Sequence, residues 1–431
     1  MARRRPPTAG SPVQDGLHFH PSPPIATNKK VASPLTDIPD HLLAEILIRL
    51  PSPEDLARIS AACVSFRRLA TDRSFLRCFR RLHAPPLLGF RDHDGFYPAL
   101  PPHPSAPAAR ALALAADFSF SFLPSHCRWA VQDIRDGRVL LHRLHEQRDQ
   151  LPLFTELVVC DPLHRRYILL PQVPDDLAAS VQHLDPTVRK PQCTTFFLPI
   201  GEEEAAAAVE ETTFRVICMI HCEHYLSTFV FSSSTGQWRA AASKAWSDLI
   251  LSKREAVMMS QIHPFFLRRQ YAYGCFYWDW LIIKIKKLLV FDTRRMEFSM
   301  ADLPPGEWRM QVAIVEAGQG MLGMFVFRGG TAAGLSYIVA QHKGDSPSKW
   351  QTEKRISLDS GYKYCIEDAT ERYLLLGRTE TSFLENPLTE YFSMGIKTLK
   401  LQRICAKQST LMYGNRLYTN FPPSLLSSPT I

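Results

Sequence analysis

The densest group of potential metal ligands in the sequence lies in the stretch CMIHCEH, which holds Cys218, His221, Cys222 and His224. Cysteine sulfur and histidine nitrogen are the usual ligands of structural zinc, and such sites normally draw a second ligand pair from a suitable distance along the chain. No such pair stands near this stretch. On a β-strand, Cys218 and Cys222 would share one face and His221 would lie on the other. We therefore predict buried thiols without a bound metal.

The patterns that mark enzyme active sites are missing. The sequence contains no nucleophile elbow, no phosphate-cradling glycine loop and no metal-binding His-Glu pair. Its Gly-rich segments GQGMLG and RGGTAAG lie between β segments, so we interpret them as turns. The run Glu202, Glu203 and Glu204 indicates a loop rather than a paired acid and base. The sequence therefore predicts no catalytic residue and no cofactor.

The composition is that of a globular protein. Of 431 residues, 45% are hydrophobic and 21% are charged, and this length allows about two or three domains. The net charge of +8 permits an acidic partner but does not indicate nucleic acid. The ten cysteines form no CxxC pair, no apolar signal core follows MARRRPPTAG, and lysines interrupt the longest apolar run, WDWLIIKIKKLLVF. We predict a protein of the cytoplasm and/or nucleus with reduced thiols and no membrane segment.

Residues 34–82 carry the spacing of short helices. Apolar residues recur at three- and four-residue steps on one stripe, namely Leu42, Leu43, Ile46, Leu47 and Leu50. Pro39 suits a first helical turn, Pro51 ends the helix and Pro53 starts another. Two more helices are predicted over residues 64–69 and 74–82. Helices this short cannot bury their own apolar faces, so we expect them to pack against the rest of the chain or another protein.

The order of residues in this segment resembles an F-box. The matching positions are Leu35, Ile38, Pro39, Leu42, Ile46, Leu47, Leu50, Pro51, Asp55, Leu56, Cys63, Val64, Ser65, Arg67, Arg68 and Leu69, with Phe66 where the family often has Trp. F-boxes dock on the Skp adaptor of cullin-based ubiquitin ligases. The resemblance implies adaptor contacts at Leu35, Pro39, Leu42, Ile46, Leu47, Leu50, Leu56 and Ser65. The alternative is a small helical bundle that closes one end of a β domain.

A basic run follows the motif. It consists of Arg67, Arg68, Arg73, Arg77, Arg80 and Arg81. No aromatic stacking pattern or base-reading motif accompanies these arginines, so we interpret them as a solvated helix face placed to meet an acidic adaptor rather than nucleic acid.

From residue 111 the pattern changes to short strands joined by turns. Turn signals stand at Asp136-Gly137, Asp161-Pro162, Thr235-Gly236 and Asp292, each between apolar runs. Thr235 and Asp292 are 57 residues apart, and Asp292 and Trp350 are 58 apart. Repeats of this size predict blades around an axis. This half resembles the kelch-related, F-box-associated β domain common in plant F-box proteins. An irregular β-sandwich or an incomplete propeller is the alternative, and the number of blades stays open.

The predicted fold is α+β and multidomain, with a small N-terminal all-α F-box followed by a large all-β propeller-like domain. We expect a disordered arm over residues 1–33, the F-box over 34–82, a Pro-rich linker over 83–110, the propeller-like domain over 111–421 and a flexible tail over 422–431. The acidic and Ala-rich tract 201–213 is predicted to be a loop or a single helical excursion.

The resemblance implies the substrate-recognition subunit of a Skp–cullin–F-box ubiquitin ligase, which needs no catalytic residue of its own. Its expected partners are a Skp-family adaptor, a cullin scaffold reached through that adaptor, and a protein substrate. Two alternatives stay open: an F-box protein that sequesters a partner outside any ligase, and a propeller enzyme. A convergent cluster of buried carboxylates or histidines at the propeller mouth would favour the enzyme.

Overall fold

The structure is a computed structural model that describes residues 38–420, apart from 51–52, 84, 125–126, 145–151, 182–189, 200–212, 250–251, 253, 256–257, 259–267, 280–285, 305–307, 329–333, 344–345, 348–349, 381–387 and 409–413. The arm expected over 1–33, the tail expected over 422–431 and nearly all of the tract 201–213 lie outside the described residues.

The chain divides into two compact units, and the boundary between them along the sequence falls between His83 and Ala84. The first unit is helical and consists of α1 (Asp40–Leu47), α2 (Pro53–Ser60), α3 (Val64–Thr71) and α4 (Arg73–Leu82). Its core gathers apolar side chains from all four helices: Leu43, Leu47, Leu56, Ala70, Phe75 and Phe79. Asp72 caps α4, because its carboxylate accepts a hydrogen bond from the Phe75 amide at 2.8 Å.

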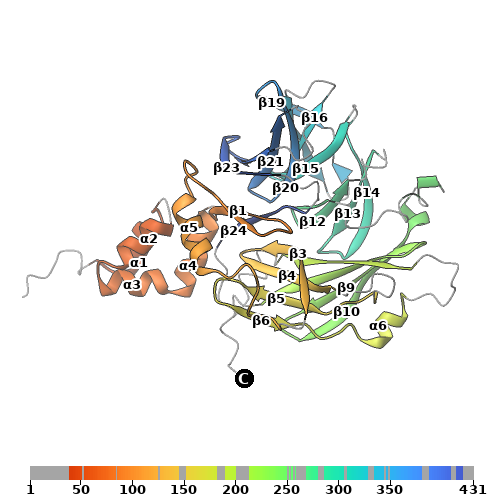
Figure 1. Cartoon of the computed structure of the whole chain (residues 1–431), viewed down its shortest axis with the longest axis horizontal. Coiled ribbons are helices and arrows are strands. Elements are labelled where there is room, and N and C mark those ends of the chain that lie inside the picture. The colour runs from red at the N-terminus through yellow and green to blue at the C-terminus, as the bar shows by residue number, and fades with distance from the viewer. Residues whose placement is uncertain are drawn as a thin grey trace, which may run out of the picture. The chain divides into compact units, whose positions relative to one another are not determined.

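The second unit is a β-propeller whose described strands form six sheets, or blades (Figure 1). Blade 1 is β3 (Arg128–Arg135), β4 (Arg138–Leu144), β5 (Leu157–Asp161) and β6 (Arg166–Leu169). Blade 2 is β7 (Gln192–Leu198), β8 (Arg215–His221), β9 (Tyr225–Ser232) and β10 (Gln237–Ala245). Blade 3 is β11 (Arg269–Ala272), β12 (Cys275–Asp279), β13 (Lys287–Asp292) and β14 (Glu297–Asp302).

Blade 4 has five strands, β15 (Trp308–Gly318), β16 (Met321–Arg328), β17 (Gly334–Lys343), β18 (Ser346–Pro347) and β19 (Gln351–Ser357). Blade 5 is β20 (Tyr362–Ala369), β21 (Tyr373–Glu380), β22 (Leu388–Gly395) and β23 (Leu401–Gln408). Blade 6 is β24 (Arg416–Thr419), β1 (Leu87–Arg91) and β2 (Phe96–Pro98). The helical elements of the second unit that the structure describes with bounds include α5 (Ala106–Ala115), α6 (Asp175–Ala179) and η3 (Trp246–Leu249).

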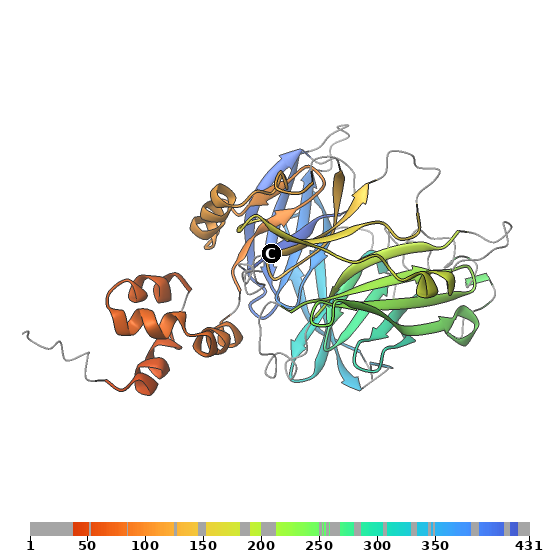
Figure 2. The ribbon, with the colours of Figure 1, turned by 90° about the horizontal axis from the view of Figure 1, so that it is seen from below.

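Blade 6 closes the ring, because it joins strands from opposite ends of the unit. The antiparallel partners of β1 are β2 on one side and β24 on the other. Both views show the orange strands of residues 87–98 beside the blue C-terminal strands (Figures 1 and 2). The Tyr418 hydroxyl donates a hydrogen bond to the Gly137 carbonyl at 2.7 Å, which ties β24 to the first turn of blade 1.

The hydrophobic core lies between neighbouring blades. One buried cluster combines Phe196 and Ile217 of blade 2 with Phe276 and Trp278 of blade 3, and the other large clusters of the propeller likewise join adjacent blades. Each blade is covered by a neighbouring blade on both faces, so its inner strands are buried on both sides. This explains the nearly continuous runs of buried residues in β5, β8 and β12. The six-bladed propeller confirms the all-β prediction for this half.

Three of the four turn signals in the sequence occupy the same place in their blades, whereas Asp136-Gly137 joins the first strand of blade 1 to the second. The turns after Asp161, Ser232 and Asp292 join the third strand of a blade to the fourth. In two of these turns the aspartate carboxylate caps the loop: Asp161 accepts from the amides of residues 163 and 164, and Asp292 accepts from those of residues 294 and 295. The predicted period is therefore the recurrence of this outer hairpin.

The linker prediction for residues 83–110 is wrong. This segment contains β1, β2 and the first half of α5, so the second unit begins at Ala84 and not at residue 111. Proline is compatible with this structure, because Pro98 ends a short edge strand and Pro107 stands in the first turn of α5. Ala109 and Leu112 of α5 are buried in the core around blade 6.

Charged side chains on several blades form a network that ranges from buried at Asp133 to partly exposed at Arg135 and Glu371, which we call the axial network. Asp133 of β3 accepts from the Arg269 guanidinium of β11 at 2.6 Å and from the Phe197 amide of β7 at 2.8 Å. The other pairs in the network are Arg135 with Glu371, Arg416 with Asp368, Asn415 with Glu367, and Arg268 with Glu367 at the longer distance of 3.9 Å. The network thus connects blades 1, 2, 3, 5 and 6.

Candidate adaptor-binding surface

Helix α1 has two apolar stripes that point in different directions. Leu43 and Leu47 are buried in the core of the helical unit. Leu42 and Ile46, each one residue earlier, are 44% and 55% exposed, and Pro39 before the helix is also exposed. Positions 39, 42 and 46 follow three- and four-residue steps, so these side chains lie on one outward stripe. The core of the helical unit uses the first stripe and leaves the second uncovered.

The structure divides the eight residues that the sequence assigns to adaptor contact. Pro39, Leu42 and Ile46 are exposed. Leu50 and Ser65 are half-buried. Leu47 and Leu56 are core residues of the helical unit, with 2% and 5% exposure, so their side chains support the helices from within. Leu35 lies outside the described residues.

Two further large apolar side chains are exposed on the helical unit. Val64, the first residue of α3, is 81% exposed, and Leu82, the last residue of α4, is 66% exposed. The sequence reasoning did not assign either to the surface. Val64 could have been found from its place directly after the Cys63 N-cap, because first-turn residues seldom reach a helix-packing face. A small unit that exposes several large apolar side chains is compatible with a protein interface.

A comparison with protein-family models finds the F-box-like family at residues 35–81. The chain carries an F-box-like domain. The matched range agrees with the resemblance read from the sequence, and it covers the helical unit from the residues before α1 into α4. The predicted order of a helical F-box module followed by an all-β propeller is thereby confirmed.

No curated protein matches the chain. Solved structures with partial similarity include the WD40 domain of SCAP from fission yeast, at 9% identity over 66% of this chain and 87% of that chain, with a TM-score of 0.28. Others are the β-propeller domain of the Trilobed protease from Pyrococcus furiosus (7% identity, 64% and 70% coverage, TM-score 0.32) and the Aleuria aurantia lectin (10% identity, 67% and 79% coverage, TM-score 0.30). These TM-scores support no inference about function.

Charges border the outward stripe of the F-box-like domain. Asp40 of α1 pairs with Arg68 of α3 at 2.5 Å, and both side chains are more than half exposed. Arg67 is also exposed. The Asp40–Arg68 pair links α1 to α3, but an exposed pair contributes little stability. None of the described helices is long and apolar enough to span a membrane.

The side chains of the CMIHCEH stretch point to different environments. Cys218 and Cys222 are buried in the cluster between blades 1 and 2. The His221 ring lies near the Trp246 ring, whose side chain belongs to the cluster between blades 2 and 3, and His224 is exposed. This confirms that His221 faces away from the two thiols.

We expect purified protein to contain no stoichiometric zinc, because these four side chains do not converge. Elemental analysis measures the metal directly, and thermal unfolding with and without a chelator measures its contribution to stability. One zinc per chain, or a lower melting temperature with chelator, would contradict this expectation.

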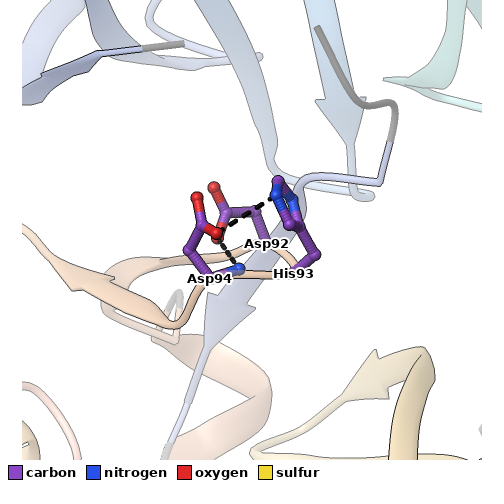
Figure 3. A group of neighbouring side chains, drawn as sticks. All are labelled: Asp92, His93 and Asp94. Carbon is purple, nitrogen blue, oxygen red and sulfur yellow. Dashed lines mark hydrogen bonds and ion pairs between the residues drawn. The ribbon is translucent and has the colours of Figure 1, made fainter. Parts of the chain in front are cut away.

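Among the described residues, the potential metal ligands that do lie close together are Asp92, His93 and Asp94 in the turn after β1 (Figure 3). A lysine already supplies the positive charge there. The Lys407 ammonium contacts the Asp92 carboxylate and lies 3.4 Å from that of Asp94, with the Tyr97 ring 4.4 Å away. Although burial alone lowers the pKa of Lys407, its bond to Asp92 raises that pKa above the usual range. The group is therefore an ion-pair network between β23 and blade 6.

Replacing Lys407 with Met should destabilise the propeller by about 1–3 kcal/mol. The Asp92 side chain is 4% exposed and would lose its cation, although the amides of Asp94 and Gly95 would still donate to it. Chemical denaturation gives the free energy of unfolding. Replacing the exposed Lys397 with Met is the matched control, and equal effects of the two changes would contradict the assignment.

A histidine and a serine form a buried pair in the propeller, His103 with Ser393. His103 Nε2 lies 3.1 Å from Ser393 Oγ, and burial lowers the pKa of His103. The Ser105 amide donates to His103 Nδ1, so the neutral imidazole carries its proton on Nε2 and donates it to the serine. A general base would need to accept from the serine instead. The axial network likewise pairs its carboxylates with arginines, so neither group favours the enzyme alternative.

Proposed function

We propose that this protein is the substrate-recognition subunit of a Skp–cullin–F-box ubiquitin ligase. The observation that carries the proposal is the outward stripe of Pro39, Leu42 and Ile46 on a helix that already buries Leu43 and Leu47. A helix with a second, uncovered apolar stripe suits a partner that offers an apolar groove. The match to the F-box-like family supports a Skp-family adaptor as that partner, and a cullin would join through the adaptor.

The propeller would hold the substrate. Its blade interiors are filled by buried side chains such as Trp238, Phe291 and Phe298, so recognition would take place on the turns at one rim. The chemistry would belong to other subunits. Tethering a substrate lysine close to a ubiquitin-charged enzyme converts an encounter between separate molecules into an effectively intramolecular one, which accelerates transfer without a catalytic residue on this chain.

The test uses a substrate captured on residues 84–431 while the proteasome is blocked. Full-length protein should shorten the half-life of this substrate in cells. Residues 84–431 alone should lengthen it, because the propeller would occupy the substrate without delivering it to the ligase. If both forms shorten the half-life equally, the ligase proposal fails. If both lengthen it equally, the protein sequesters its partner instead.

A further inference from the structure

Two thiols on neighbouring strands of blade 2 are in contact. Cys193 Sγ of β7 lies 2.8 Å from Cys218 Sγ of β8. The strand register places Cys193 opposite Ile220 and Thr195 opposite Cys218, so the two cysteines are diagonal neighbours on one face of the sheet. A disulfide bond joins sulfurs at about 2.05 Å. The two sulfurs therefore need to approach by less than about 1 Å to form one.

The two thiols differ in their access to solvent. Cys193 is half-buried, whereas Cys218 is 1% exposed. Burial raises the pKa of the Cys218 thiol, and its hydrogen bond with Cys193 acts in the same direction, so Cys218 stays protonated at neutral pH. A soluble oxidant would therefore meet the sulfur of Cys193 first.

We propose that Cys193 and Cys218 form a site of reversible oxidative modification, with hydrogen peroxide as the oxidant and an internal disulfide as the product. The Cys193 thiolate attacks one peroxide oxygen, the O–O bond breaks, and hydroxide leaves and takes up a proton to become water. Cys193 is then a sulfenic acid. The Cys218 sulfur attacks the Cys193 sulfur, the S–O bond breaks, and the hydroxyl group leaves as water with the Cys218 proton. Two thiols are oxidised and one peroxide is reduced to two waters.

The disulfide would link β7 to β8 near the end of blade 2 where a hairpin connects β8 to β9. Cys222 provides a matched comparison, because it is equally buried in the same cluster and lies at that hairpin. Its sulfur is 4.0 Å from the Val181 carbonyl oxygen and also shares a hydrogen bond with the Tyr225 side chain. The geometry thus favours Cys218, and not Cys222, as the partner of Cys193.

Trypsin separates the cysteines in a useful way. Cys193 falls in the peptide 190–215, and Cys218 and Cys222 both fall in the peptide 216–239. Full-length protein is treated with hydrogen peroxide, its remaining thiols are blocked, and the digest is analysed by mass spectrometry with and without a reducing agent. We expect a species that joins the two peptides with the loss of two hydrogens and disappears on reduction. The titratable thiols of the unfolded chain should fall by two from the original ten.

The variants assign the bond. Cys193→Ser and Cys218→Ser should each abolish the linked species, and Cys222→Ser should retain it. A link that persists in Cys218→Ser but is lost in Cys222→Ser would overturn the assignment. Wild-type protein that loses thiols to peroxide without linking the two peptides would overturn the proposal itself. Because Cys193 is half-buried, its change to Ser keeps the test valid even if Cys218→Ser folds poorly.

Discussion

Replacing Ile46 with Asp is expected to abolish binding of the Skp-family adaptor while the F-box-like domain stays folded. Ile46 is 55% exposed and stands on the outward stripe of α1, so the new carboxylate would be solvated in the free protein. In a complex it would enter an apolar groove without a partner, and burying an unpaired charge is costly. Central interface residues commonly contribute about 2–4 kcal/mol, which corresponds to roughly a 30- to 1000-fold loss of affinity.

Two controls separate lost contact from lost structure. His41→Asp adds the same charge to an exposed position of α1 outside the stripe, so it should leave binding nearly unchanged. Leu47→Asp places the charge in the core and should unfold the domain. The measurements are adaptor affinity by calorimetry and helix content by circular dichroism. Adaptor binding by Ile46→Asp at wild-type affinity would contradict the proposed surface.

Replacing Arg269 with Met should destabilise the propeller by about 3–5 kcal/mol. The Arg269 guanidinium pairs with Asp133 at 2.6 Å and lies 4.2 Å from the centre of the Phe196 ring. Burial lowers the pKa of Arg269 to about 10, and Asp133 acts in the opposite direction, so the guanidinium is charged at neutral pH. Methionine keeps much of the apolar contact with Phe196. It removes the guanidinium, however, and the Asp133 carboxylate then keeps the hydrogen bond from the Phe197 amide.

Tryptophan fluorescence reports this change selectively, because all seven tryptophans follow residue 84. The free energy of unfolding in urea should fall and the slope of the transition should stay constant. Arg143→Met removes a more exposed pair with Glu156 and should have a much smaller effect. If the two variants lose the same free energy of unfolding, the smaller exposure of the Arg269–Asp133 pair does not explain its contribution to stability.

Local patterns predicted the local parts of the structure. The apolar steps through Leu43 and Leu47 formed helix α1, and the turn signals at Asp136, Asp161 and Asp292 formed hairpins. The number of blades could not be read from these signals. In blades 1, 2, 3 and 5, the turn between the third and fourth strands contains a residue with a positive φ near its end. These residues are Arg165, Gly236, Met296 and Leu399. A conserved backbone conformation with four different side chains leaves no clear repeat in the sequence.

Contacts between segments far apart in the sequence could not be predicted from local patterns. Residues 83–110 were predicted to be a linker because their prolines are visible in the sequence, whereas the pairing of β1 with β24 is not. The same holds for the axial network, where Asp133 and Arg269 meet across more than a hundred residues of chain. The helical spacing predicted one apolar stripe, and the resemblance to an F-box implied the adaptor contacts. Only the packed domain separates Leu47 and Leu56, which face inward, from Leu42 and Ile46, which face outward.

The pairing of β1 with β24 also determines the order in which the two units can complete their folding during translation. The contacts of the F-box-like domain lie before residue 84, so this domain can fold early in translation. Blade 6 has to wait for residues 416–419, and until they emerge β1 has one open hydrogen-bonding edge. The nascent chain therefore passes through a long interval in which it is competent to bind an adaptor but has no closed ring. During that interval the open edge of β1 is available for mispairing with strands of other nascent proteins.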